Sequence, residues 1–321
     1  MSVYLGVDFG TRAVRIFHRE KGIVLREPNV AAVDTKGNVV AVGTEALLIS
    51  ARAPGTVTVR RPMSGGSITD FNLAAEILDR FLEIAAPRTK KHIIASARYG
   101  LGTASRELLK RALSDCRTGH VSIVDSSLAS LLGSGFTPEP DEAEALSGTV
   151  ICDIGAGSIE ASYIRSGELM RTETLIGAGD AADNGIMSHL RRNYGLAVTQ
   201  SSAREAKHRL SLSEATEDAV FTGIDGSTGM PKRVQISSDV LLECCNSQIG
   251  GVVNTLSKLM ENLPYRGETP SSVDRIILVG GGAALPGIGE YTGGKLNLAV
   301  TTADDPANCT VKGLGEMISK L

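Results

Sequence analysis

Two short segments of the sequence carry the same order of aspartate, glycine and hydroxyl residues. Residues 5–13 read Leu-Gly-Val-Asp-Phe-Gly-Thr-Arg-Ala, and residues 150–158 read Val-Ile-Cys-Asp-Ile-Gly-Ala-Gly-Ser. Each is an apolar strand that reaches an aspartate, followed by a small turn and a second strand. Glycine permits a tight turn whose backbone amides can point at an anion. Two copies this far apart in the chain predict two similar lobes with a site between them.

Two opposed hairpins of this kind would suit a polyphosphate. A triphosphate needs amides and hydroxyls near its oxygens, and its Mg²⁺ needs a carboxylate, often through a water molecule. Asp8 and Asp153 stand where they would hold the metal. The residues facing the phosphates would be Gly10, Thr11, Gly155, Gly157 and Ser158. The alternative is a pair of ordinary hairpins with Asp and Gly in their turns, which either copy alone would favour.

A third glycine-rich segment lies near the C-terminus. A strand predicted at Arg275–Val279 runs into Gly280-Gly281-Gly282. Because glycine has no side chain, such a triplet leaves room for a phosphate or a nucleoside. The triplet alone is a weak signal. The order of two hairpins followed by a strand and a glycine triplet is a much more specific signal for a nucleotide site than the triplet alone.

The alternation of strands and helices predicts an α/β fold. We expect strands at Ile23–Leu25, Val30–Val33, Val39–Val42, Thr56–Arg60, His92–Ala97 and Val121–Val124. We expect helices at Leu73–Leu82, Leu108–Cys116, Leu128–Leu132, Asp239–Leu263 and Val311–Leu321. Asp70 or Asn72 would cap the first of these helices. The segment Thr137–Gly148, with its prolines and carboxylates, predicts a boundary between the lobes.

The composition narrows the classes of protein and partner. The chain has 321 residues, enough for about two domains, with a net charge of -3 and 4% aromatic residues. This balance does not favour a nucleic-acid partner. The odd number of cysteines, five without a CxxC pair, predicts reduced thiols in a cytosol. No apolar stretch approaches the ~18–20 residues of a membrane span, and the N-terminus reads directly into a strand, so we expect a cytoplasmic protein.

The order of these motifs resembles the superfamily of actin, sugar kinases and heat-shock chaperones, and within it the MreB and Mbl-type bacterial actins. The segments that match MreB outside the nucleotide motifs are residues 22–30, then 54–55, 61–63 and 69–71, then 223–225, 227–229 and 231, and finally 305–306 and 312–315. The resemblance implies an actin-like two-lobe ATPase fold with duplicated ribonuclease-H-like cores and two small accessory subdomains. It places the first core lobe at 1–30, 66–145 and 304–321, the first small subdomain at 31–65, the second core lobe at 146–181 and 240–303, and the second small subdomain at 182–239.

The same resemblance brings further residues to ATP. Arg12 and Ala13 would border the phosphates from the first lobe, and Ala156 from the second. The segment with Arg204, Glu205 and Lys207 matches the wall around ribose and adenine, although its spacing alone favours a solvated helix face. The residues passing under the nucleotide would be Gly281, Gly282, Ala283 and Ala284. Asp153 is the candidate catalytic residue.

Three departures from MreB bear on hydrolysis. The helix that follows the central strand begins in MreB proteins with Thr-Asp-x-Glu-Arg, and its Glu positions the attacking water. Here Ser105 stands at the position of that Glu, and serine cannot act as a carboxylate base at neutral pH. Ala13 replaces an Asn of the first turn, and Asp125-Ser126-Ser127 replaces a Glu-Glu-Pro segment. We therefore expect a slow ATPase at most.

The resemblance implies a cytoskeletal protein that binds Mg·ATP between its lobes and polymerises into filaments that organise cell shape or cell-wall synthesis. Its partners would be further copies of itself and cell-wall synthesis or morphogenesis proteins. A membrane surface stays open as a partner through the basic loop at residues 86–92, but no anchor is evident. Three alternatives also stay open: a small-molecule kinase, a chaperone-type ATPase, and a degenerate scaffold with weak or no hydrolysis that acts through partners.

Overall fold

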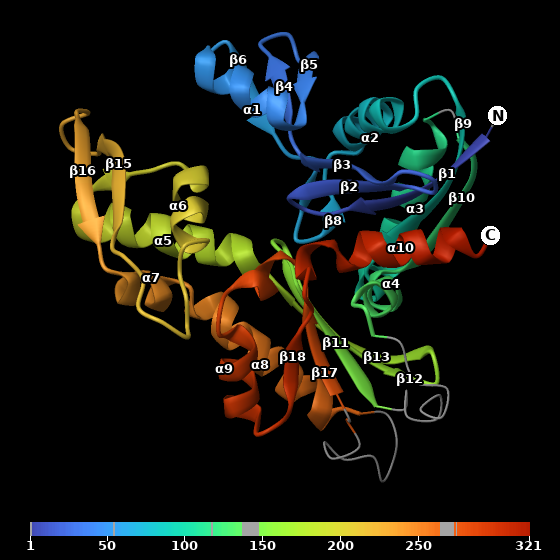
Figure 1. The fold of residues 1–321 in the computed structure, drawn as a ribbon. Helices are drawn as coiled ribbons and strands as arrows, with labels where there is room; N and C mark the ends of the chain where they lie inside the picture. Colours follow the sequence, from blue (N-terminus) through green and yellow to red (C-terminus); the bar gives the residue numbers. More distant parts are fainter. Residues whose placement is uncertain (1, 54, 117, 137–147, 264–272, 274) are drawn as a thin grey trace.

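Two five-stranded sheets of the same topology organise the molecule (Figure 1). The structure is a computed structural model and describes residues 2–53, 55–116, 118–136, 148–263, 273 and 275–321. In each sheet, three strands that follow one another in the chain pair antiparallel, and two later strands add in parallel at one side. The sequence repeat is thus the most visible part of a duplicated sheet.

The first sheet has the strand order β10-β9-β1-β2-β3, and the second has the order β13-β12-β11-β17-β18. The first consists of β1 (Ser2–Phe9), β2 (Ala13–His18), β3 (Gly22–Pro28), β9 (Lys90–Ala97) and β10 (Thr118–Asp125). The second consists of β11 (Thr149–Ile154), β12 (Ser158–Arg165), β13 (Glu168–Ile176), β17 (Arg275–Val279) and β18 (Val300–Thr302). Each predicted hairpin therefore lies at the middle of its sheet.

Helices cover both faces of the first sheet. These are α2 (Phe71–Ala85), α3 (Gly102–Ser114), α4 (Ser126–Gly133) and α10 (Cys309–Ser319), with a short 3-10 turn η1 (Tyr99–Leu101) before α3. Leu5 and Val7 of β1 join the apolar core with α2 and α3. Gly6 between them faces α10, because a Cβ atom there would lie 2.8 Å from the Cβ of Leu314. We call this sheet with these helices the first core.

The second sheet packs with α5 (Ala178–Tyr194), α8 (Asn246–Glu261) and α9 (Ile288–Leu296). Two 3-10 turns, η4 (Gly281–Ala284) and η5 (Pro306–Asn308), lie after β17 and before α10. Apolar residues of α5 and α8 and the buried side of β11 and β12 form one continuous core. Burial of this apolar surface is the main term that stabilises the unit, which we call the second core.

Two small sheets project from the cores (Figure 1). One, beside the first core, contains β4 (Ala31–Asp34), β5 (Val39–Val42), α1 (Gly43–Arg52) and β6 (Val57–Arg60). The other, beside the second core, contains β14 (Leu196–Ala197), α6 (Gln200–Lys207), β15 (Ala219–Asp225), β16 (Pro231–Ile236) and α7 (Ser238–Cys244). A two-stranded ribbon of β7 (Met63–Ser64) and β8 (Ser67–Ile68) leads back into the first core.

The predicted long helix at Asp239–Leu263 is two helices. The residue between α7 and α8 is Cys245, with φ −90° and ψ 0°, values that leave the regular helix. A close approach of α5 accompanies the break, since a Cβ atom added to Gly185 would lie 2.4 Å from the carbonyl oxygen of Cys244. Apolar periodicity continues through the break and therefore did not reveal it.

Other predicted elements are present with shifted ends, and three helices were not predicted. The cap of α2 is Asp70, whose side chain accepts a hydrogen bond from the amide of Leu73 at 3.1 Å. The unpredicted helices are α1, α5 and α9. Of these, α5 buries Ala178, Ala182, Ile186 and Leu190 at a regular four-residue spacing. The first two side chains are small and the helix contains two glycines, so this face is only weakly apolar in the sequence. The predicted boundary at Thr137–Gly148 lies, except for Gly148, outside the described residues.

All five cysteines are free thiols, as predicted. Burial raises the pKa of Cys245 to about 12 and that of Cys309 to about 11. In the part of the chain that the structure describes, no helix combines the length and the apolar character needed to cross a bilayer. Of the basic segment at residues 86–92, Lys91 belongs to strand β9, is buried and forms an ion pair with Glu83 at 3.4 Å, so its charge does not face outward.

Glycine is required where α4 crosses α10. A Cβ atom added to Gly313 would lie 1.7 Å from the carbonyl oxygen of Ala129, and one added to Gly133 would lie 1.9 Å from that of Cys309. The two helices therefore pack backbone against backbone. This contact fixes α10 against the first core beside the gap between the two sheets.

We predict that Gly313→Ala lowers the free energy of unfolding by about 1–3 kcal/mol, because the added methyl group overlaps backbone that cannot rotate away. The measurement is the urea midpoint at constant slope. The matched control is Gly294→Ala in α9, where an added Cβ meets nothing within 4 Å. That variant should gain about 0.5–1 kcal/mol from helix propensity. Equal effects of the two substitutions would contradict the close crossing.

Candidate functional site

Each of the two predicted hairpin turns is closed by the same backbone hydrogen bond. The amide of Gly10 donates to the carbonyl of Ala13 at 3.0 Å, and the amide of Gly155 donates to that of Ser158 at 2.8 Å. The first turn is held further by Asn29, which is fully buried and donates through Nδ2 to the carbonyl of Gly10 at 2.8 Å. Both turns are therefore held in shape by hydrogen bonds of the chain itself.

The two turns lie against each other across the gap between the cores. A Cβ atom added to Gly157 would lie 2.6 Å from Thr11 Oγ1. The second turn is supported from behind by α5, because the amide of Asp180 donates to the carbonyl of Ala156 at 2.8 Å. The opposed arrangement inferred from the repeat is what the structure contains.

Two adjoining cavities open around the turns, with volumes of about 200 Å³ and 760 Å³. They share the lining residues Arg12, Ala13, Arg15, Gly155, Ala156 and Gly281, so they form one continuous cleft. The smaller one, the turn cavity, also contains Asp8, Asp153, Arg98 and Ser105 in its lining. The larger one, the outer cavity, extends toward α6 and has a volume typical of small-molecule sites.

Two glycines of the triplet allow close packing of the chain, and the third leaves open space in the cleft. A Cβ atom at Gly280 would lie 2.1 Å from Asp153 Oδ1, and one at Gly282 would lie 2.3 Å from Ile154 Cγ2. These two glycines therefore make room for protein atoms. At Gly281 an added Cβ meets nothing within 4 Å, and this residue lines both cavities. Of the triplet, Gly281 is the position at which a missing side chain leaves open space.

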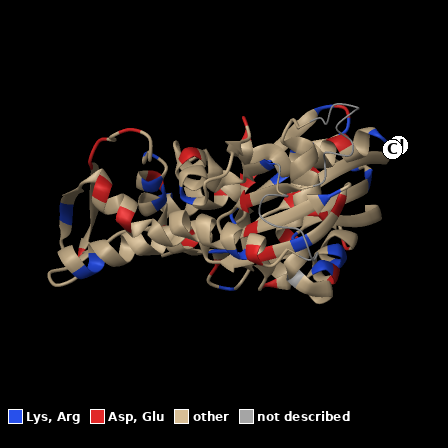
Figure 2. Cartoon of the chain, turned by 90° about the horizontal axis from the view of Figure 1, so that it is seen from below, with Lys and Arg blue, Asp and Glu red and all other residues tan. Residues whose placement is uncertain are grey.

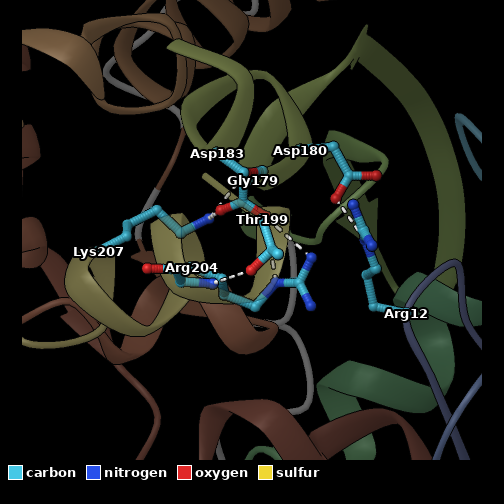
Figure 3. Close-up of polar contacts among 8 residues, drawn as sticks. Arg12, Gly179, Asp180, Asp183, Thr199, Arg204 and Lys207 are labelled. Carbon is cyan, nitrogen blue, oxygen red and sulfur yellow. Dashed lines mark hydrogen bonds and ion pairs between the residues drawn. The ribbon is translucent and has the colours of Figure 1, made fainter. Parts of the chain in front are cut away.

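Asp183 of α5 holds two predicted site residues in place (Figure 3). Its carboxylate is fully buried and contacts Arg204 Nη2 at 2.9 Å and Lys207 Nζ at 2.6 Å. Lys207 also donates to the carbonyl of Gly179 at 2.7 Å. Arg204 and Lys207 thus line the outer cavity and also anchor α6 to α5. Because one carboxylate faces two cations, the pair carries a net positive charge toward the cleft.

Arginine side chains are concentrated on the cleft. Arg12 forms an ion pair with Asp180 at 2.6 Å across the gap (Figure 3), yet its Nη1 is buried and has no acceptor among the described residues. The same holds for Nη1 of Arg61, which lines the outer cavity. Burial, together with the nearby charges of Arg12 and Arg204, lowers the pKa of Arg61 to about 10. Buried N–H groups without acceptors are costly, and an anion would satisfy them.

Three carboxylates lie close together at the inner end of the cleft. Burial, together with the charges of Asp8 and Glu160, raises the pKa of Asp153 to about 7. Burial also raises the pKa of Asp8 and of Glu160. Ser127 of α4 donates to Glu160 Oε1 at 3.1 Å, which links the first core to the second. Glu160 pairs with Asp153 in the register of β11 and β12.

These residues do not fit a divalent cation well. Asp8 already forms an ion pair with Arg15 at 3.2 Å. The guanidinium groups of Arg98 and Arg15 both act on Asp153 and lower its pKa against the effect of burial. Among the described residues, no group of three or more His, Cys, Asp or Glu side chains is arranged to hold a metal ion.

The structure brings most of the predicted site residues to the cleft but not all. Glu205 is exposed, pairs with Arg209 of the same helix and is not part of either lining. Ala283 is buried beneath the cleft, while Ala284 lines it. The residues that sequence reasoning missed are Arg15, Arg61, Arg98, Glu160, Asp180 and Asp183. Arginine in an otherwise apolar strand, as in Val14-Arg15-Ile16, was an available signal for the first of these.

Two duplicated sheets, each with a small projecting sheet and with a cleft between the cores, define an actin-like protein. The solved structures that share this fold include MreB5 of Spiroplasma citri bound to ADP, with a TM-score of 0.89, 24% identity and coverage of 100% of this chain and 98% of that one. A MamK double helical filament shares it with a TM-score of 0.81, 20% identity and full coverage of both chains. These likenesses show the actin-like α/β fold that the sequence predicted.

The family described as MreB/Mbl protein matches residues 2–321, and the chain belongs to this family. Among its relatives, the cell shape-determining protein Mbl of Bacillus subtilis (strain 168) is 27% identical over 325 residues, covering 99% of this chain and 96% of the relative. The cell shape-determining protein MreB of Escherichia coli (strain K12) is 25% identical over 329 residues, covering 99% and 93%. The predicted family is therefore confirmed.

We predict that Asp153→Asn stabilises the fold in a pH-dependent manner. In the folded chain the pKa of Asp153 lies at about 7, above its ordinary value of 3.8, so the ionised carboxylate destabilises the native state as the pH rises. The variant should melt a few degrees above the wild type at pH 8.5, and the gap should shrink toward pH 5. The difference in melting temperature between variant and wild type is measured by circular dichroism at four pH values. Asp115→Asn, at an exposed position after α3, is the control and should give a constant difference. A gap that widens toward pH 5 would refute the assignment.

Proposed function

We propose that this chain is a cytoskeletal actin homologue that binds ATP in the cleft between its two cores and polymerises into filaments that organise cell shape or cell-wall synthesis. The cores and small subdomains would follow the boundaries inferred from the sequence, with residues 31–65 and 182–239 as the two small subdomains. ATP would draw the cores together and so set the surface that polymerises. Partners would be other copies of the chain and proteins of cell-wall synthesis.

The observation that carries the proposal is the pair of buried guanidinium nitrogens, Nη1 of Arg12 and Nη1 of Arg61, for which the described part of the chain offers no acceptor. The outer cavity is lined by six Arg and Lys side chains and three Asp and Glu side chains, although the whole chain has a net charge of -3. Figure 2 shows that basic and acidic residues are otherwise interspersed over the molecule. The local excess of positive charge favours an anionic ligand, and guanidinium groups match phosphate geometry.

The hairpin turns favour a polyphosphate over a simple anion. Thr11 and Ser158 bring hydroxyl groups to the turn cavity, and Gly281 leaves open space at the junction of both cavities. The larger outer cavity has room for a nucleoside next to the phosphates. The related MreB5 structures hold ADP in one case and AMPPNP in another, which supports a nucleotide as the ligand of the cleft here.

Filament formation is supported by the family and by one neighbour. The relatives are described as cell shape-determining proteins, and the MamK neighbour is a double helical filament. The residues around the cleft also link the cores by direct contacts, such as Arg12 to Asp180 and Ser127 to Ser162. A ligand that changes these contacts would change how the cores lie relative to each other, and with it the surface offered to a second copy.

We predict that ATP is hydrolysed slowly or not at all. Ser105 of α3 lines the turn cavity, and a serine cannot accept the proton of an attacking water as a carboxylate would. Phosphate release should stay below about one turnover per several minutes, far under the usual range of about 1–10³ per second. A malachite-green assay on the polymerised protein measures it. Introducing a carboxylate by Ser105→Glu should raise the rate, with Ser114→Glu at the end of the same helix as control. A wild-type rate near one per second would contradict this role for Ser105.

The nucleotide dependence of assembly tests the main proposal. The purified protein is sedimented with ATP, with ADP and with neither, and bound nucleotide is measured in the pellet. We expect pelleting with ATP only. Gly281→Leu should abolish both binding and pelleting, because Gly281 lines both cavities and a Cβ atom added there meets no protein atom within 4 Å, so the new side chain takes up ligand space. The matched control, Gly294→Leu at an exposed position of α9, should behave as the wild type.

The outcomes of that experiment separate the alternatives. If the protein pellets equally with and without nucleotide and no nucleotide is bound, the proposed ATP site is refuted. The remaining alternative is then a scaffold that acts through partners. Binding of ATP without pelleting would retain the site and reject the filament for the purified protein. Hydrolysis that rises many-fold with a sugar or another small alcohol would favour a kinase.

A further inference from the structure

The two carboxylates predicted to hold Mg²⁺ are already facing cations of the chain itself. Asp8 on β1 and Arg15 on β2 are directly opposite in the register of the hairpin, and Arg15 Nη1 lies 3.2 Å from Asp8 Oδ2. Because the register of the hairpin sets this pair, it does not depend on a flexible loop. The side chains of both residues are four-fifths buried or more, so solvent does not weaken the interaction much.

Arg98 brings a second guanidinium to the same place from the first core. It follows the last residue of β9, and its side chain reaches across the gap to donate to Ser158 Oγ on the second hairpin. Its other terminal nitrogen donates to the carbonyl of Gly65. The charges of Glu160 and Asp153 act on the Arg98 guanidinium. Arg98 thus stands among the carboxylates while it touches the turn that would hold the phosphates.

More guanidinium groups than carboxylates line the turn cavity, while Asp180 and Glu160, which face Arg12 and Arg98, are not part of this lining. Its lining includes Arg12, Arg15 and Arg98 against Asp8 and Asp153. A Mg²⁺ ion needs oxygen ligands at about 2.0–2.1 Å and gives up its waters reluctantly. To use Asp8 it would have to displace Arg15 at close range and remain beside a second guanidinium. Repulsion between the ion and these groups opposes that exchange.

We propose that Arg15 and Arg98 supply the positive charge that a divalent cation supplies at other triphosphate sites, so that this cleft takes a nucleoside triphosphate free of metal. The inference rests on the nucleotide site proposed above and adds its metal requirement. Guanidinium groups form charge-assisted, often bidentate hydrogen bonds to phosphate oxygens. Arginine and Mg²⁺ serve the same electrostatic purpose at phosphoryl groups. A metal-free triphosphate also carries more negative charge than its Mg²⁺ complex and gains more from a basic lining.

The first experiment uses the unmodified protein and ATP. Binding is measured by isothermal titration calorimetry in EDTA and again in excess Mg²⁺ at matched ionic strength. We expect ATP to bind in EDTA at least as tightly as in Mg²⁺. A loss of about tenfold or more in affinity on chelation would overturn the inference while leaving the nucleotide site in place. Failure to bind ATP under both conditions would reject the nucleotide site itself, so the two failures are distinguishable.

The second experiment removes the proposed cations one at a time. Arg15→Leu and Arg98→Met should each weaken metal-free ATP binding by about tenfold or more, the loss of a charge-assisted hydrogen bond. Added Mg²⁺ should restore part of the affinity, because Asp8 or Asp153 becomes free to hold it. The control is Arg233→Met on β16, an exposed arginine that does not line either cavity. It removes the same charge and should change the affinity for ATP neither in EDTA nor in Mg²⁺.

Two controls distinguish a loss of binding from a folding defect: the variant Arg98→Lys, and thermal melts of every variant. The lysine variant keeps the charge and should retain metal-free binding better than Arg98→Met does. If both cleft variants are folded and bind ATP in EDTA as the wild type does, the two arginines have no part in binding and the proposal is wrong. If the variants unfold, the comparison of EDTA with Mg²⁺ on the wild type still decides the metal requirement.

Discussion

Buried negative charge between the two cores is the constraint on which the rest of the cleft depends. Asp8, Asp153 and Glu160 lie at its inner end, where burial raises the pKa of each. Carboxylates so placed must be protonated, hydrogen-bonded or matched by cations. The chain uses all three means: the pKa of Asp153 rises to about 7, Ser127 donates to Glu160, and Arg15 pairs with Asp8.

The same compensation joins the two cores. Arg98 and Ser127 belong to the first core, and their partners Ser158 and Glu160 belong to the second. Arg12 adds a further ion pair to Asp180 of α5. A ligand that enters the cleft must therefore compete with contacts that hold the cores together. The binding free energy of the ligand and the relative position of the cores are therefore linked. The link arises in the cleft itself, without a chain of contacts to a distant surface.

The sequence predicted the parts of this arrangement that are local and missed those that depend on distant segments. The repeat of Asp, Gly and hydroxyl residues lies within nine positions in each copy, so the two hairpins and their central place in each sheet could be inferred. Arg98 and Ser158 lie 60 positions apart, and Arg12 and Asp180 lie 168 apart. No spacing rule joins such pairs, because only the folded sheets bring them together. Glu205 illustrates the converse, since a polar residue in a matching segment turns outward on its helix.

The arginines also change what the replacement of a glutamate by Ser105 means. Taken alone, the absence of a carboxylate base at position 105 indicates a loss of ATP hydrolysis. In the folded chain Ser105 lines a cavity that already contains three guanidinium groups and two carboxylates. A further carboxylate in the turn cavity would add to the negative charge that raises the pKa of Asp153, and it would compete for Arg15 and Arg98. The serine, the arginines and the lack of an evident metal site among the described residues are therefore mutually consistent. Together they favour a cleft that holds a triphosphate and keeps it over one that cleaves it rapidly.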